Sequence, residues 1–221
     1  DVRWNGNGWQ IENVRTGSAY GEEAVYQYAG SITVAGKRQK CNITVRRDQE
    51  GGNGYVMDFT LIDSNSKETL QQHQYKLPED FMPDTIQDGS RILDVNHDGN
   101  DDIMLDLGVY GWPRYYACFV YDSSRNEYRQ VPQFEEHPFP YVLSDQGVVL
   151  FHWKDGAATY GVDKYQIEGN QLHMLGRLTK IFGQSGVRYA EETMVGGVLV
   201  KIKEDVTAKE IDHFDAWNMW D

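Results

Sequence analysis

The chain has 221 residues and a formal net charge of −13, from 34 Asp and Glu against 21 Lys and Arg. Its 40% hydrophobic and 25% charged residues exclude an intrinsically disordered protein, and no apolar run is long enough for a transmembrane segment. The acidic balance disfavours nucleic acids and anionic membrane surfaces as partners and favours cationic ones.

The N-terminal half is predicted to be a series of β-strands that follows a poorly structured segment, residues 1–24, in which only Trp9–Val14 has strand character. β-Branched and aromatic residues dominate the later runs, and Gly30 is expected to end one of them. These runs are Val25–Tyr28, Ser31–Val34, Asn42–Val45 and Tyr55–Ile62. Residues 77–89 contain two prolines and are expected to form a loop.

The C-terminal half is predicted to continue as hairpins, because short strand-like runs flank polar or glycine-rich turns. The paired runs are Tyr115–Tyr121 with Glu127–Val131, Lys164–Glu168 with Gln171–Leu175, and Tyr189–Val195 with Val198–Lys203. Only the tail has helical spacing, since Ile211, Phe214 and Trp217 fall three apart after a Thr207 cap.

These patterns together predict an all-β fold of antiparallel hairpins, arranged as a meander, a sandwich or an irregular propeller. A short C-terminal helix is expected over residues 207–221, after a β region that spans residues 25–206. We expect residues 1–221 to form a single domain.

The segment Asp94–Asp102 has the donor pattern of a calcium loop. Ca²⁺ takes six to eight oxygen ligands, which alternate residues of a tight loop can supply. The predicted ligands are the side chains at positions 1, 3, 5 and 9 and the carbonyl at position 7, namely Asp94, Asn96, Asp98, Asp102 and Asn100. Gly99 occupies position 6, where the chain must turn sharply.

Strand-like residues flank this loop on both sides, and position 12 is Leu105 rather than the glutamate of a helix-flanked site. We therefore predict a β-flanked Ca²⁺ site that stabilises the fold. The alternative is an ordinary polar turn, because Asp, Asn and Gly are common in turns.

Motifs for catalysis are missing from the sequence. The six histidines are scattered without metal-ligand spacing, and no nucleophile elbow or phosphate-binding glycine loop is present. We expect a protein that is not an enzyme, although distant carboxylates can converge without a motif. Cys41 and Cys118 are either two buried thiols or one long-range disulfide.

Two segments are candidates for partner binding. Trp112 begins the run Trp-Pro-Arg-Tyr-Tyr and offers a stacking surface for a sugar or a protein, although aromatic residues also pack β cores. Ser185-Gly186-Val187-Arg188-Tyr189 reads Ser-Gly-x-x-Tyr. This motif resembles the loop that bacterial lysozyme inhibitors insert into the lysozyme cleft. The resemblance implies that Ser185 and Tyr189 meet the catalytic carboxylates, with Arg188 as an added cation; the alternative is a turn that leads into a strand.

A longer resemblance covers about half of the chain, from Ile92 to Lys203. It includes the loop Leu93–Ile103, the strand-like runs Tyr115–Asp122 and Tyr165–Leu172, the turn Gly156–Tyr160 and the hairpin Glu191–Gly197. In these residues the chain is similar to exported bacterial calcium-loop proteins that include an immunity protein against a lysozyme-like interbacterial toxin.

The resemblance implies an exported protein, periplasmic or at the cell surface, with a lipid anchor as one option. Its implied function is inhibition of, or immunity against, a lysozyme-type peptidoglycan hydrolase. Such a partner is basic, and an acidic chain would be steered toward it. The alternatives from other classes are a carbohydrate-binding or adhesive module of the cell envelope and a glycan-active enzyme.

Overall fold

The computed structural model describes residues 24–48, 54–77, 81, 90–107 and 113–217. The regular elements among these residues are antiparallel strands and short 3-10 turns, so the predicted all-β fold is confirmed. The described residues form two compact units. The first unit contains those up to Asp94 together with Asp98–Val131, and the second contains Val95–His97 and those from Pro132 onward. This grouping subdivides the single domain that the sequence predicts.

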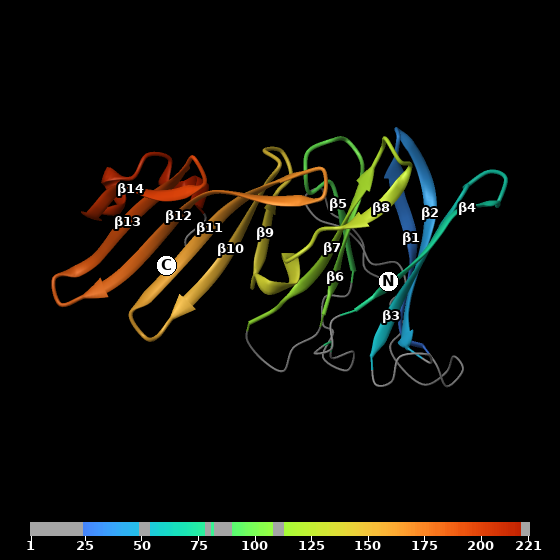
Figure 1. Cartoon of the computed structure of the whole chain (residues 1–221), viewed down its shortest axis with the longest axis horizontal. Helices are drawn as coiled ribbons and strands as arrows, with labels where there is room; N and C mark the ends of the chain where they lie inside the picture. The colour runs from blue at the N-terminus through green and yellow to red at the C-terminus, as the bar shows by residue number, and fades with distance from the viewer. Residues whose placement is uncertain (1–23, 49–53, 78–80, 82–89, 108–112, 218–221) are drawn as a thin grey trace. The chain divides into compact units, whose positions relative to one another are not determined.

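The first unit consists of two four-stranded antiparallel sheets (Figure 1). One sheet joins, in order, β1 (Ala24–Val34), β2 (Lys37–Arg47), β3 (Tyr55–Ile62) and β4 (Thr69–Lys76). The other joins β5 (Ser90–Leu93), β6 (Asp102–Asp106), β7 (Tyr116–Asp122) and β8 (Glu127–Gln130). Each strand pairs with the next along the chain, so both sheets are meanders built from hairpins.

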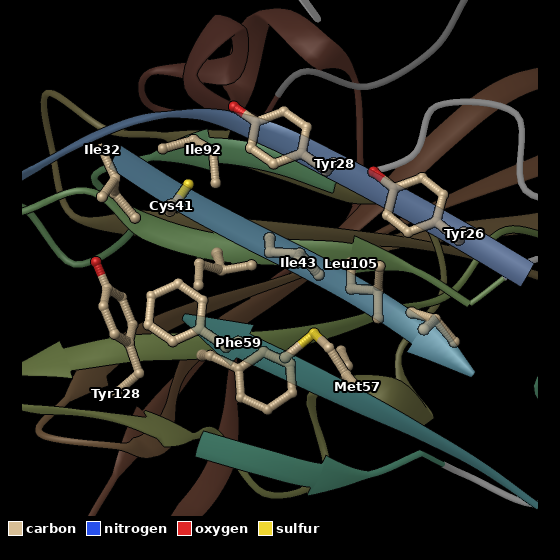
Figure 2. Packing of buried hydrophobic residues seen from close by; sticks show 14 of the residues in the cluster. Tyr26, Tyr28, Ile32, Cys41, Ile43, Met57, Phe59, Ile92, Leu105 and Tyr128 are labelled. Carbon is tan, nitrogen blue, oxygen red and sulfur yellow. The ribbon is translucent and has the colours of Figure 1, made fainter. Parts of the chain in front are cut away.

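The two sheets of the first unit share one apolar core (Figure 2). Successive residues of a strand face opposite sides, and in β2 the residues Cys41, Ile43 and Val45 are fully buried between exposed or half-buried neighbours. Phe59 of β3 meets Tyr128 of β8 edge to face, with ring centroids 4.8 Å apart. Such aromatic contacts across the core add to the free energy gained by burying apolar area.

Gly30 lies inside β1 rather than at its end, which makes the predicted break there wrong. The ring of Tyr28, two residues earlier on the same face, lies over Gly30. A Cβ atom at position 30 would be only 2.1 Å from the Tyr28 hydroxyl oxygen. A larger residue at position 30 would have to displace the Tyr28 ring, and the strand continues through the glycine.

The second unit contains a single six-stranded antiparallel sheet with strand order β14-β13-β12-β11-β10-β9 (Figure 1). A 3-10 turn, η2 (Phe134–Glu136), precedes the sheet. Its strands are β9 (Pro140–Leu143), β10 (Val148–Asp155), β11 (Thr159–Glu168), β12 (Gln171–Gly183), β13 (Gly186–Val195) and β14 (Val198–Val206). This sheet, too, is a meander of hairpins.

The C-terminal segment covers one face of this sheet. It forms two 3-10 turns, η3 (Ala208–Glu210) and η4 (Phe214–Trp217), where the sequence predicts one short helix. The Glu210 carboxylate accepts hydrogen bonds from the backbone N–H and the hydroxyl of Thr207, each at 2.8 Å. Ile211 and Trp217 are buried against Leu178 and other apolar residues of the sheet, so tertiary packing rather than helix length holds this segment in place.

Both cysteines are buried free thiols, which decides between the two alternatives for them. Burial raises the pKa of the Cys41 thiol to about 12 and that of the Cys118 thiol well above its ordinary value. Both thiols are therefore protonated and act as small apolar core residues.

No helix within the part of the chain that the structure describes is long and apolar enough to cross a membrane.

Candidate functional site

The aspartate loop, residues 94–101, connects two antiparallel strands. Leu93 of β5 pairs with Asp102 of β6, so the predicted β-flanked geometry is confirmed. Gly99 has φ +85°, in the left-handed region where glycine carries no steric cost, as its place in the pattern predicts. His97 is exposed with φ +60°.

Two carboxylates of the loop accept hydrogen bonds from N–H groups of the same loop and so stabilise its turn. Asp94 accepts backbone N–H bonds from Asp98 at 3.1 Å and from Gly99 at 2.9 Å. Asp98 Oδ1 accepts bonds from the backbone N–H of Asn100 at 2.8 Å and from its side-chain amide at 3.0 Å. These local bonds replace the strand pairing that the loop backbone lacks.

Other loop side chains hold β1 in place. The Asp101 carboxylate accepts the backbone N–H of Thr33 at 2.6 Å, and the Asp101 N–H donates to the Thr33 carbonyl at 2.8 Å. The Asn100 side-chain oxygen accepts the N–H of Ala35 at 2.7 Å. Asp102 is fully buried and accepts the N–H of Tyr121 at 2.9 Å. The loop therefore links the two sheets of the first unit, a role that sequence spacing does not reveal.

The predicted calcium ligands differ in their surroundings. Asp94 and Asn96 are half-buried, Asp98 is exposed, and Asn100 and Asp102 are buried. Among the described residues, no three carboxylate, imidazole or thiol side chains converge on a point that could hold a metal ion. Each oxygen of Asp94 accepts one N–H and retains a second lone pair, so Asp94 keeps donor capacity for a cation. Calcium binding remains a prediction that rests on the donor pattern.

The motif around Ser185 lies at the turn between β12 and β13. Gly183 pairs with Gly186, which leaves Gln184 and Ser185 as an exposed two-residue hairpin turn. Gly186 has φ +109°, a conformation that other residues rarely adopt. The motif therefore forms a turn that leads into a strand, which was the alternative interpretation, and this turn exposes Ser185 to solvent.

A pocket of about 450 Å³ opens beside this turn. Ser185 and Arg188 both line it, so the structure brings these two predicted site residues together. Thr179 and Ala190 are paired neighbours on adjacent strands and also line it, on the face of the sheet opposite the apolar core. The other lining residues are Ile181, Gly183, Tyr189, Glu192, Lys201, Glu204 and Asp205.

Irregular strand pairing accompanies the pocket. The register between β13 and β14 shifts on both sides of Glu191, and Asp205 near the end of β14 has φ +53°. Asp205 then lies 3.7 Å from Arg188, and Lys201 pairs with Glu204 at 2.5 Å. Sequence reasoning missed these β14 residues, because a bulge leaves no mark on the alternation of apolar residues.

Tyr189 has surroundings different from those that the motif implies. Its side chain is 7% exposed and packs edge to face against Phe214, with ring centroids 5.1 Å apart. Neighbours on a strand point to opposite faces, so Arg188 faces the pocket while the Tyr189 ring belongs to the core of the second unit. We therefore assign Tyr189 a structural role. Trp112, the other predicted binding residue, lies outside the described residues.

A partly buried ion pair supports the pocket face of the sheet. Asp163 of β11 accepts two bonds from the Arg177 guanidinium, at 2.6 and 2.7 Å, and one from the Trp153 indole N–H at 2.8 Å. The bonds with Asp163 raise the pKa of Arg177 above its ordinary value. Arg177 also pairs in register with Glu192 of the pocket wall, so the network gives that wall a fixed support.

Comparison with known proteins gives one structural similarity. No protein-family model matches the chain. A search of curated proteins finds no match either. Among solved structures, a Xanthomonas protein described as related to a type IV secretion system is similar, with a TM-score of 0.52 and 14% identity. The alignment covers 87% of this chain and 100% of the Xanthomonas chain. At this identity the likeness shows a shared fold.

Proposed function

We propose that this protein is a non-catalytic binding protein of the bacterial cell envelope that inhibits a lysozyme-type peptidoglycan hydrolase. The observation that carries the proposal is the exposed β12–β13 turn, where Ser185 and Arg188 line one pocket. The Ser185 hydroxyl and the Arg188 guanidinium can donate hydrogen bonds to the two catalytic carboxylates of such a cleft.

Electrostatics support a basic partner. The net charge of −13 would steer a basic hydrolase toward this protein and make its association rate fall with ionic strength. Arg188 would then supply the local cation that the carboxylates of the cleft require, since its guanidinium is 38% exposed and its Asp205 partner is 79% exposed. Exposed ion pairs are weak, so Arg188 can exchange Asp205 for a carboxylate of the partner.

The proposed envelope location rests on the sequence resemblance. The Xanthomonas protein with a similar fold is described as related to a secretion system, and this description is compatible with export. We propose that Ca²⁺ binds the aspartate loop through Asp94 and Asp98 and stabilises the first unit, with no direct role in inhibition.

The experiment is an inhibition assay with a basic lysozyme of the animal type, with this chain as the inhibitor. Arg188→Ala should raise the inhibition constant about tenfold to a hundredfold, because truncating a buried Arg contact typically costs about 1.4–2.8 kcal/mol. Ser185→Ala should raise it about tenfold through the loss of one hydrogen bond to a charged group.

Two control variants test the site assignment. Gln171→Ala lies on β12 at the end away from the turn and should leave inhibition unchanged. Tyr189→Phe should do the same, because the ring that packs in the core is retained. Full inhibition by both Ser185→Ala and Arg188→Ala would refute this site, and a chain that inhibits no tested hydrolase would refute the proposed function.

A further inference from the structure

The outer face of the β1–β4 sheet carries many polar side chains. Its register aligns rows of hydroxyl, amide and carboxylate side chains across the strands, such as Asn42, Thr60 and Gln72, and next to it Thr44, Asp58 and Gln74. Asn42, Gln72 and Gln74 are exposed. No aromatic residue occupies an outward register position among the described residues of this sheet.

This face is basic although the whole chain is acidic. β2 places three basic residues, Arg38, Lys40 and Arg46, at outward positions, and these form a basic strip along the strand. Arg46 is paired with Asp58 at 2.7 Å, whereas no ion pair occupies Arg38 or Lys40 among the described residues. Charges are screened beyond about 8 Å at physiological ionic strength, so a ligand at β2 experiences this strip rather than the net charge of −13.

A groove of about 500 Å³ lies on the strip. Lys40 and Lys67 contribute two ammonium groups, and Ser31 and Asn42 contribute a hydroxyl and an amide. Ala29, Gly30 and Ile62 complete its lining. The Asp63 carboxylate orders the adjacent β3–β4 turn by accepting the N–H groups of Asn65 and Ser66 at 2.8 and 2.7 Å. The groove therefore offers cations beside neutral hydrogen-bonding groups.

We propose that this outer face binds an acidic polysaccharide, one with a carboxylate on its sugar rings, along β2. Alternate residues of a strand are about 6.8 Å apart, so Arg38 and Lys40 meet charges that are spaced by a sugar ring, and Ser31 and Asn42 meet ring hydroxyls. Nucleic acid fits less well, because its charge density is higher and no outward aromatic ring is available for base stacking. An anionic membrane fits less well because interfacial binding uses a broad apolar face, whereas Leu70 is the exposed large apolar residue on this side.

Polygalacturonate is the probe, and its affinity for the full chain is measured at low salt and again at physiological salt. The variant Lys40→Gln/Lys67→Gln should lose at least tenfold in affinity. The matched control Lys154→Gln/Lys201→Gln removes the same charge from the second unit and should bind as the parent does. Asn42→Ala changes no charge and should weaken binding several-fold, since a hydrogen bond contributes about 1 kcal/mol.

Three outcomes would overturn the proposal: no binding of polygalacturonate, an equal loss in the control variant, or tighter binding to phosphatidylglycerol vesicles or single-stranded DNA than to polygalacturonate. The proposal does not depend on hydrolase inhibition, because the two surfaces lie in different units and share no residue.

Discussion

The two units bury their apolar sheet faces in different ways. In the first unit, two four-stranded sheets share one core, to which both contribute aromatic and branched side chains. In the second, one six-stranded sheet places its apolar face against the short C-terminal segment, which contributes Ile211 and Trp217. A second sheet can cover the apolar face of a sheet along its whole length. Two 3-10 turns cover only the part of the face that they contact.

This difference accounts for the exposed hairpin ends of the second unit. β12 has 13 residues, and its last three, Ile181–Gly183, are exposed. Val195 and Val198 at the β13–β14 turn are 57% and 63% exposed. Strands of five or six residues are usual. The extra length of β12 therefore extends beyond the part of the sheet that the C-terminal segment covers. Uncovered strand ends are available for partner contacts, and the turn that contains Ser185 is one of them.

Core truncations test whether each unit is an independent stability unit, and they should have the largest effect. Phe59→Ala should lower the free energy of unfolding of the first unit by about 3–5 kcal/mol, and Trp217→Ala should do the same to the second. Chemical denaturation followed by unit-specific hydrogen exchange measures both. A single transition that both variants shift equally would contradict this comparison.

Loss of the contact between the aspartate loop and β1 should have the second-largest effect on stability. Asp101→Ala removes the acceptor of the Thr33 N–H and should cost the first unit about 1.5–3 kcal/mol, the range for a hydrogen bond to a charged group. Asp98→Ala removes two bonds to Asn100 within the loop and should cost less. Equal losses in the two variants, measured by denaturation, would show that the link to β1 contributes nothing of its own.

Calcium should also act on the first unit. With a dissociation constant of about 0.1–1 mM, 10 mM Ca²⁺ would stabilise the folded state by about 1.4–2.7 kcal/mol. Thermal unfolding with Ca²⁺, Mg²⁺ and chelator measures the effect, and Asp94→Asn should abolish it. A melting temperature that does not respond to Ca²⁺ would refute calcium binding by the loop.

Mild acid should lower the stability of the second unit at a higher pH than that of the first. This effect should be the smallest. Burial among the rings of Phe151 and Tyr165 lowers the pKa of His137 in the second unit. The unfolded chain then binds the proton first, so stability is complete above pH about 6.5 and is lost as the pH falls through the lowered pKa. In the first unit, the Ser124 hydroxyl and Arg129 lower the pKa of Asp122, which places its loss of stability below pH about 4. His137→Phe should remove the loss that begins below pH about 6.5 in unfolding experiments.

Strand prediction succeeded where one face of a strand is buried. Cys41, Ile43 and Val45 alternate with polar residues, and this alternation appears directly as the inner face of β2. β4 was missed, because its sequence Thr-Leu-Gln-Gln-His-Gln-Tyr-Lys has little apolar content to form a pattern. Strands of this kind are specified by pairing with a neighbour, here β3, and pairing partners are not encoded locally.

The candidate sites were predicted in part. Spacing around Gly99 identified the aspartate loop and its strand flanks. The bonds from Asp101 to Thr33 join residues 68 positions apart, so no local pattern contains them. Ser185 and Arg188 line one pocket, as their place in one motif suggests, whereas alternation along β13 turns the Tyr189 ring to the opposite face from Arg188. The motif alone does not contain this difference, which follows from the two-residue period of a strand.

Local chemistry in the chain is sufficient to specify an all-β protein, its hairpin turns and a loop rich in oxygen donors, because alternation, turn residues and donor spacing each act over a few neighbouring residues. Three features depend on contacts between distant residues: the division into two units, the Ser185–Arg188 pocket beside an irregular β14, and the basic groove at Lys40 and Lys67. Each arises from strand register and side-chain packing, which bring together groups that the sequence keeps apart.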